Sequence, residues 1–536
     1  MSPIGAIKGN WRVLLLGAFL VFAVVALFIP GGIVADDGLA SDSVDSGPTN
    51  LEFGLGLEGG SRIRVPVAGM TAEDIDTGAV SDDGTVDQER IDGIESTLQS
   101  ELDLDQADVS VAVQDDGTVT AEVFNDNVSE SEFAAALQTA DIDATEDDIR
   151  DGVTQSTRDN MIRTIQTKIN AAGLSGGTAY ESTTVSGDHY IVVEVPNMDA
   201  DELRTILSER GQVKVVAYHP ENGTQTNDTV LRGEDIVEVD PPEQNPRGSG
   251  YFVPVQVSED AAPGFQQQMV DLGFTTEGQG QCSLSGDSGS VDFDHDGQQY
   301  CLLTVVDDEV VDAHSMGDLA NPMNEGSWEN DPTFQMGAPS QEQAQSLSVN
   351  LRAGSLRAPL DFSEEQVYSI EPGHADQFKQ YSLLIGLLSV LTVSGVVYAR
   401  YTDTRVALPM IVTAIAEVVI LLGFAALIRM PLDLSHVAGF IAVVGTGVDD
   451  LVIIADEVMD EGDVSSERVF QSRFRKAFWV IGAAAATTVV ALSPLAVLSL
   501  GDLRGFAIIT ILGVFIGVLI TRPAYGDILR RLLTDR

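Results

Sequence analysis

Carboxyl groups inside apolar segments are the part of this sequence best suited to chemistry. Glu417 lies at the centre of an apolar stretch over residues 407–427, and Asp449 and Asp450 lie within the next stretch. A charged carboxylate at the middle of a bilayer costs about 2.5 kcal/mol or more, so it needs a proton, a cation or a water-filled path. Because such residues are typical of ion and proton pathways, we predict ion-coupling roles for Asp449, Asp450 and Glu417.

The spacing of a helix separates the two aspartates. Thr446, Asp449, Ile453 and Asp456 recur at three, seven and ten residues and therefore share one helix face. Asp450 is rotated by about 100° from Asp449, so the two cannot face one partner equally. Asp456 and the glutamate after it are expected near the cytoplasmic interface. For Asp450, a position at that interface and one inside the helical bundle both stay open.

Glu417 should face the bundle, because an unpaired glutamate facing lipid would be unfavourable. It could relay protons with Asp449, or form a hydrogen bond with Thr487 or Thr488. No Lys or Arg lies near the middle of the apolar segments that follow residue 380. We therefore expect any cation that pairs with Asp449 to come from another subunit.

Six apolar segments are long enough to cross a bilayer and would position these residues. They cover roughly residues 13–34, 382–399, 406–428, 434–455, 477–499 and 505–521. The first follows Lys8 and Arg12 and could be a cleaved signal peptide. Its long apolar core and the lack of a clean small-x-small cleavage site favour a retained anchor.

Basic residues collect at the span ends on one side, which predicts that both termini are cytoplasmic. That side includes Arg400, Arg405, Arg473, Arg475, Lys476 and Arg522. The organisation that follows is a cytoplasmic N-terminus at 1–12, an anchor at 13–34, an acidic linker at 35–50, an extracytoplasmic αβ domain at 51–380, a five-helix transmembrane region at 381–522 and a cytoplasmic C-terminus at 523–536. The protein is expected in the cell membrane with its large domain outside.

The composition is strongly acidic, with 82 acidic against 29 basic residues and a formal net charge of −53. Such a surface repels nucleic acid and anionic lipid headgroups, so we expect neither as a partner. The 44% of hydrophobic residues argues against disorder, because the apolar residues gather in the spans and the acids outside them. Dense like charge is tolerated where salt screens it, so we expect a halophile, and an archaeal one.

The only two cysteines, Cys282 and Cys301, both lie in the predicted outer domain. A pair outside the membrane fits a disulfide that closes a small loop, although two unpaired thiols remain an alternative. Between them, residues 292–297 read Asp-Phe-Asp-His-Asp-Gly, the first half of a calcium loop. The twelfth position is Leu303, which cannot supply the bidentate carboxylate. We therefore expect a solvated turn, no metal site and no cofactor.

The outer domain alternates apolar strands with amphipathic helices. The predicted order is a helix at 158–172, a strand at 190–195, a helix at 200–210 and a strand at 212–218, after strand material at 108–124. This order matches part of a ferredoxin-like sandwich. The predicted fold class is therefore an α+β membrane protein with six membrane helices and a large extracytoplasmic domain that contains ferredoxin-like αβ parts.

Four motifs occur in order along the chain. They are Leu-Gly-Leu-Glu-Gly-Gly at 55–60, a helix at 158–173 followed by Ile-Val-Val-Glu-Val-Pro at 191–196, Leu-Arg-Ala-Gly-Ser-Leu-Arg-Ala-Pro-Leu at 351–360, and Gly-Thr-Gly-Val-Asp-Asp at 445–450. Together they resemble the SecD/SecF family of the Sec protein-export machinery, within the RND transporter superfamily. The positions that match the family motifs include Gly56, Gly59, Gly60, Arg352, Gly354, Gly445 and Gly447. The chain departs from the family pattern at Glu58, Asn197, Arg357, Asp450 and Leu451.

The resemblance implies the fold of the membrane part and a function. Asp449 matches the family's intramembrane aspartate, and the membrane part would form one RND-type bundle of six helices. The second bundle would belong to a separate SecF-like subunit. The two subunits would act with the SecY channel on exported polypeptides, driven by an ion gradient.

Other functions are less well supported by the sequence. A nucleotide-binding Gly-x-x-x-x-Gly-Lys-Ser/Thr loop, a His/Cys metal cluster and a nucleophile elbow are all absent, so we do not expect an enzyme. An RND-type exporter of small molecules or lipids is an alternative, although such exporters usually carry both bundles in one chain. A structural assembly factor of the translocon, with Asp449 as a contact between helices, is the other alternative.

Overall fold

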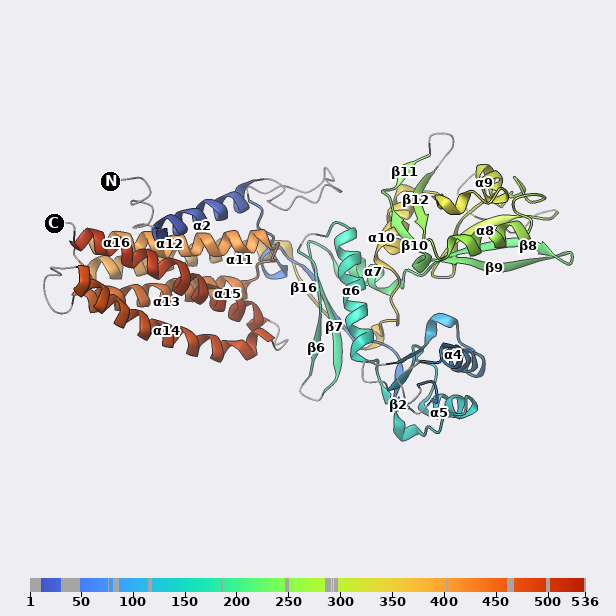
Figure 1. Ribbon diagram of the computed structural model, residues 1–536, viewed down its shortest axis with the longest axis horizontal. Helices are drawn as coiled ribbons and strands as arrows, with labels where there is room; N and C mark the ends of the chain where they lie inside the picture. Colours follow the sequence, from blue (N-terminus) through green and yellow to red (C-terminus); the bar gives the residue numbers. More distant parts are fainter. Residues whose placement is uncertain are drawn as a thin grey trace.

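The computed structural model describes residues 11–534 apart from 30–48, 76, 81–85, 114–117, 175, 185–186, 246–249, 285–290, 292, 294–296, 402, 460–466 and 498–501. Figure 1 shows an elongated molecule with a helical bundle at one end and three αβ units at the other. Most of the predicted linker at 35–50, and four of the six residues of the calcium-like loop at 292–297, lie outside the described residues.

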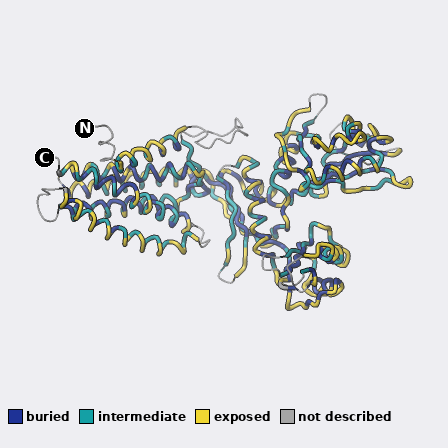
Figure 2. Tube along the Cα trace, in the orientation of Figure 1, coloured by how far each residue is buried: buried dark blue, intermediate teal, exposed yellow. Residues whose placement is uncertain are grey.

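Six helices are long and apolar enough to cross a membrane, which agrees with the predicted number. They are α2 (Trp11–Phe28), α11 (Pro372–Arg400), α12 (Thr404–Leu427), α13 (Leu434–Met459), α14 (Glu467–Val497) and a last helix formed by α15 (Asp502–Ile516), a π-helical turn η7 (Gly517–Thr521) and α16 (Arg522–Thr534). Several extend beyond the apolar segments, because a helix continues into polar turns where its backbone hydrogen bonds can still form. Figure 2 shows that α12 and α13 are buried along much of their length, whereas α14 is largely exposed.

The αβ unit next to the bundle, here called the base, has a four-stranded antiparallel sheet with the order β16-β1-β7-β6. Its elements in chain order are β1 (Gly60–Val65), α6 (Gln155–Ala171), β6 (Thr178–Thr183), β7 (His189–Pro196), α7 (Ala200–Ser208) and β16 (Gln366–Ile370). This βαββαβ order is that of a ferredoxin-like sandwich. Alternate strand residues such as Ile63 and Val193 pack against Ile165 and other apolar residues of α6.

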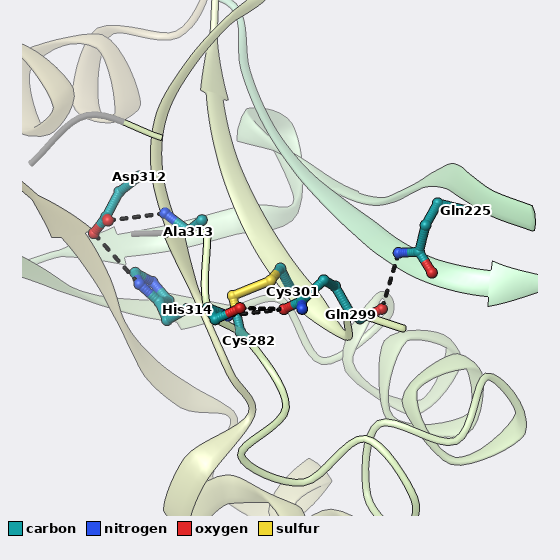
Figure 3. Close-up of a disulfide and its surroundings, with 8 residues drawn as sticks. Gln225, Cys282, Gln299, Cys301, Asp312, Ala313 and His314 are labelled. Atoms are coloured by element: carbon teal, nitrogen blue, oxygen red, sulfur yellow. Dashed lines mark hydrogen bonds and ion pairs between the residues drawn. A yellow bond between two sulfur atoms is a disulfide. The ribbon is translucent and has the colours of Figure 1, made fainter. Parts of the chain in front are cut away.

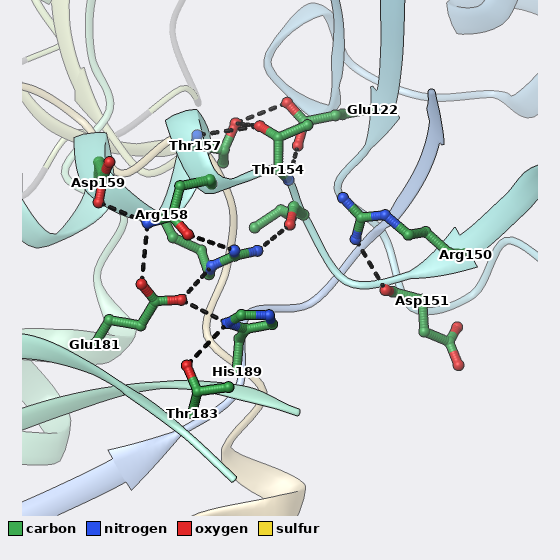
Figure 4. Close-up of polar contacts among 12 residues, drawn as sticks. Glu122, Arg150, Asp151, Thr154, Thr157, Arg158, Asp159, Glu181, Thr183 and His189 are labelled. Carbon is green, nitrogen blue, oxygen red and sulfur yellow. Dashed lines mark hydrogen bonds and ion pairs between the residues drawn. The ribbon is translucent and has the colours of Figure 1, made fainter. Parts of the chain in front are cut away.

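Two lobes are inserted into the base. The first lies between β1 and α6 and repeats the same topology, with a sheet in the order β3-β4-β2-β5. Its elements are β2 (Met70–Ile75), α4 (Gln88–Leu102), β3 (Val109–Val113), β4 (Val119–Val123), α5 (Glu130–Thr139) and β5 (Ile149–Asp151). The carboxylate of Glu122 joins this lobe to α6, since it accepts hydrogen bonds from the Thr154 backbone at 2.6 Å and the Thr157 hydroxyl at 2.7 Å (Figure 4).

The second lobe lies between α7 and β16 and has two sheets, β14-β13-β8-β9 and β10-β12-β11 with β15 beside β12. Its elements are β8 (Val213–Glu221), β9 (Thr224–Arg232), β10 (Ile236–Val239), β11 (Glu243–Gln244), β12 (Tyr251–Val257), α8 (Ala262–Asp271), β13 (Cys301–Val306), β14 (Glu309–His314), α9 (Ala320–Asn324), β15 (Thr333–Ala338) and α10 (Gln341–Ala353). A disulfide between Cys282 and Cys301 ties the loop before β13 to that strand (Figure 3).

The ferredoxin-like fold was predicted correctly, but two strand segments assigned to it belong to other sheets. The predicted strand at 212–218 is β8, which belongs to the second lobe, and the strand material at 108–124 belongs to the first lobe. The fourth strand of the base is β16, more than 150 residues further along the chain. We expected strands that follow each other in the sequence to lie in the same sheet, and this expectation fails where an inserted lobe begins.

Candidate functional site

Two acidic residues of the bundle meet one buried arginine. Arg522 on α16 and Glu417 on α12 each have only 2% of their side chain exposed. The Nη1 of Arg522 donates to both carboxylate oxygens of Glu417, each at 2.7 Å. The Nε of the same guanidinium donates to Oδ2 of Asp450 on α13 at 3.2 Å, and the Thr521 hydroxyl donates to Glu417 at 2.9 Å. One cation therefore holds carboxylates from two helices, and we call Glu417, Asp450 and Arg522 the charge triad.

Two glycines make room for the triad. A Cβ at Gly517, the first residue of the π-helical turn, would overlap the guanidinium of Arg522. A Cβ at Gly447 would lie 3.3 Å from Glu417 Oε2 and 3.4 Å from Arg522 Nη2, closer than most packed side chains allow. The other glycine of that motif, Gly445, faces open space. The lack of a side chain at Gly447 thus makes room for charged groups that approach from two other helices.

The partners of Glu417 were predicted wrongly, because Arg522 was counted with the basic residues at the cytoplasmic ends of the spans. The cation expected from another subunit concerns Asp449, which Arg522 does not contact, so that expectation stays a prediction. The last helix does not end at residue 521 but continues through the π-helical turn into α16, so the side chain of Arg522 lies inside the bundle. Glu417 consequently bonds Thr521 and Arg522 of the last helix, not the threonines of α14.

Asp449 and Asp450 point in different directions, as the helix spacing predicted. Thr446, Asp449 and Ile453 are all exposed on one face of α13, whereas Asp450 turns toward Arg522 inside the bundle. Asp449 forms no hydrogen bond or ion pair within the described part of the chain. The question left open for Asp450 is therefore answered in favour of the bundle.

The remaining acids of α13 pair with basic residues at the bundle's end. Asp456 accepts a hydrogen bond from the Tyr401 hydroxyl at 2.6 Å and lies 3.2 Å from Arg400. The next residue, Glu457, lies 2.7 Å from Lys476. Both side chains are partly exposed, which fits solvated ion pairs and not a site inside the bundle.

The first motif forms the joint between the bundle and the base. Its short helix α3 (Leu55–Glu58) sits on the loop before α13, where the Gly56 backbone donates to Asp433 Oδ1 at 3.1 Å. Gly59 and Gly60 follow with φ angles of +79° and +120°. A Cβ at either position would collide with backbone atoms of β16 or β7, so only glycine permits this approach. The two glycines thus allow β1 to begin immediately after α3, next to the bundle.

The third motif joins the base to the second lobe. Arg352, in the last turn of α10, donates from Nε to the Val239 carbonyl at 3.1 Å. Gly354 ends that helix with a φ of +76°. Leu356 then donates to the Arg210 carbonyl at 2.8 Å, and the guanidinium of Arg210 donates to the Arg357 carbonyl at 2.8 Å. These motif residues hold the chain where it returns to the base.

Protonation of a carboxylate in the charge triad can weaken its ion pair with Arg522. A proton on either carboxylate would weaken its bond to Arg522, because a neutral acid attracts a guanidinium less than an anion does. Within the described residues, no three His, Cys, Asp or Glu side chains are grouped so that they could hold a metal ion.

Known proteins match this chain along its whole length. A family model described as "Protein export membrane protein SecD/SecF, C-terminal" matches residues 354–525. "Protein-export membrane protein SecD" of Haloferax volcanii is 47% identical over 99% of this chain and 99% of its own length. The protein of the same name from Haloquadratum walsbyi is 47% identical over 98% of this chain and 99% of its own length. The chain belongs to the SecD family.

As a SecD-family protein, this chain is a multi-pass membrane protein of the protein-export machinery. Both of these 47% identical relatives come from halophilic archaea, in agreement with the high-salt setting predicted from the acidic composition. A crystal structure described as "SecDF, a translocon-associated membrane protein", from Thermus thermophilus, aligns with a TM-score of 0.47 at 16% identity. The alignment covers 99% of this chain and 59% of that chain.

Proposed function

We propose that this SecD-family chain assists the outward movement of polypeptides through the SecY channel, together with a SecF-like subunit. An ion gradient drives this work through Glu417, Asp450 and Asp449, and Arg522 is the cation that the triad holds in the absence of the transported ion. Both termini face the cytoplasm, and residues 51–380 form an extracellular domain. The role is mechanical and not enzymatic.

The observation that carries this proposal is the path along α13. Asp450 lies in the triad, and Asp433, just before the first residue of α13, holds the Gly56 backbone of the joint at 3.1 Å. These two aspartates are 17 positions apart, which corresponds to about 25 Å along one helix. A shift of α13 that follows the release of Arg522 would therefore act directly on the base, without a flexible connection.

The experiment compares Asp450→Asn with Asp456→Asn in a halophilic host that lacks its own copy. The asparagine is nearly isosteric in both variants, but only Asp450 belongs to the triad. We expect Asp450→Asn to lower export of a secreted reporter at unchanged protein level, and Asp456→Asn to leave export close to normal. Glu417→Gln is expected to give a milder defect than Asp450→Asn. Normal export by Asp450→Asn would overturn the ion-coupling part of the proposal.

Two alternatives predict different results. An exporter of small molecules or lipids would leave the secreted reporter unaffected when the whole chain is deleted. A structural assembly factor would require the chain, but export would not change when an ionophore removes the proton or sodium gradient.

A further inference from the structure

One face of the base sheet carries arginines and tyrosines in a protein with a net charge of −53. Ile63 and Val65 of β1 pack under α6, so Arg62 and Arg64, which alternate with them, point to the opposite face. The strand register places Tyr368 beside Arg62 on that face. We call the following residues the arginine face: Arg62, Arg64, Tyr180, Tyr190 and Tyr368.

The two arginines of this face have different partners. The guanidinium of Arg64 stacks 3.9 Å above the ring of Tyr190, and its Nη1 donates to the Gln366 amide at 3.2 Å. Within the described part of the chain, Arg64 has no carboxylate partner. Arg62 lies 2.7 Å from the one buried acid of the face, Glu194, which also accepts a hydrogen bond from Tyr180. Among the described residues, the charge of Arg64 is therefore not neutralised by a carboxylate.

The arginine face is on the side of the base sheet that is turned toward the membrane bundle. In Figure 1, β6 and β7 lie between α6 and the membrane bundle, and their hairpin extends past the edge of the bundle. The edge strand β16 ends at Ile370, and α11 begins at Pro372. Phe378, an exposed aromatic residue of α11, follows about 9 Å along that helix, and Tyr381 is exposed one turn later. Exposed aromatic side chains at the end of a span mark the interface of a membrane.

We propose that the arginine face binds the phosphate groups of lipid headgroups in the outer leaflet. Guanidinium groups form paired hydrogen bonds with phosphate oxygens, and stacking on tyrosine holds them ready for this geometry. The acidic composition predicts repulsion between the domain as a whole and an anionic membrane. At molar salt the Debye length is only about 3 Å, so that repulsion is screened while direct contacts persist. This binding goes beyond the export role, because it anchors the base on the membrane beside the bundle.

The test measures how accessible the face is in a bilayer. Ser182 of β6 lies opposite Tyr190 in the register and on the same face, whereas Ser156 lies exposed on α6. With Cys282 and Cys301 joined in the disulfide, Ser182→Cys and Ser156→Cys each introduce one free thiol. The full-length variants are placed in nanodiscs of phosphatidylglycerol, or of an uncharged galactolipid without phosphate, in molar KCl. The rate of labelling by a water-soluble maleimide is then measured.

We expect labelling at position 182 to be several-fold slower in phosphatidylglycerol than in galactolipid, and labelling at position 156 to be the same in both. The additional change Arg62→Gln with Arg64→Gln should remove the difference, whereas Arg163→Gln, on the exposed side of α6, should not. Equal rates at position 182 in the two lipids would overturn the proposal. Protection that arises only when a second protein subunit is added would also overturn it and would assign the face to a protein partner.

Discussion

Arg522 and Glu417, which are 105 residues apart in the sequence, form a two-pronged ion pair inside the membrane bundle, with both oxygens 2.7 Å from one guanidinium nitrogen. The pair joins the last helix to α12, and Asp450 joins it to α13. Two acids share one cation, so the triad carries one negative charge when both are ionised. We propose that a transported cation or proton neutralises that charge and thereby changes the packing of these helices.

The first prediction separates stability from function in this pair. Arg522→Gln leaves the buried Glu417 and the partly buried Asp450 without their cation, and losing one partner of a buried pair costs about 3–5 kcal/mol. We expect a large drop in melting temperature in detergent. The double variant Arg522→Gln with Glu417→Gln removes both charges and should recover most of that stability. If the triad couples ions, the double variant still fails to export the reporter, whereas full export by a stable double variant would show that the pair is only structural.

A second prediction concerns the space beside the guanidinium. Gly517→Ala places a methyl group where Arg522 now lies, so either the π-helical turn or the ion pair must shift. Overpacking of this kind typically costs about 1–3 kcal/mol. Gly445→Ala is the matched control, because nothing lies within 4 Å of its Cβ position. Thermal unfolding in detergent should show a clear loss for position 517 and little change for position 445. Equal melting temperatures for both would contradict the packing described.

The sequence predicted the membrane part of the fold better than its charge pairing. The six spans followed from segment length and hydropathy, because a bilayer imposes both. Arg522 was missed because a basic residue at the end of an apolar segment, followed by Pro523, is typical of a helix that leaves the membrane. One signal was present. Tyr525 and Leu529 follow Arg522 at three and seven residues, and all three are buried on the same face of α16.

The fold of the base was predicted only in part. Its helix and strand at 155–196 have clear periodicity, and the glycines of the first motif mark the start of β1. The fourth strand could not be found from adjacency, because a lobe of well over one hundred residues separates α7 from β16. The orientation of Asp450 also required the neighbouring helix, since spacing alone separates it from Asp449 without saying which of the two faces the bundle.

A third prediction concerns pH and lies in the outer domain. Burial lowers the pKa of Lys168 on α6 to about 8 from its usual 10.5, although Asp307 and Glu209 act in the opposite direction. Its ammonium donates to the Glu209 carbonyl at 2.8 Å, near the start of the second lobe. Between about pH 8 and 10.5 the unfolded chain binds more protons than the folded one, so stability should rise with pH in this window. The penalty of the buried charge is fully present below pH 8.

The measurement is a series of thermal unfolding curves of the full chain across this pH range. Lys168→Met keeps the length and apolar character of the side chain but removes the titrating group. The wild-type chain should gain stability relative to this variant as the pH rises, on the order of 3 kcal/mol over the whole window. Parallel curves for the two proteins would show that Lys168 is not buried as a charged group.

The last prediction uses the exposed aspartate. Asp449 lies on the outer face of α13 beside Thr446 and Ile453, and it has no partner within the described residues. A carboxylate that faced lipid there would be costly, so we expect a second membrane subunit to cover this face and supply a group that bonds Asp449. Asp449→Asn should leave the melting temperature of the isolated chain nearly unchanged, because no bond inside the chain is lost. It should nevertheless lower the amount of a SecF-like subunit that copurifies from native membranes and should reduce export.

Asp450→Asn is the matched control one residue away, since it should disturb the triad inside the chain and leave copurification intact. If Asp449→Asn retains its partner but loses export, Asp449 acts in ion transfer and not in assembly. Normal export and normal copurification together would mean that this face of α13 has neither role.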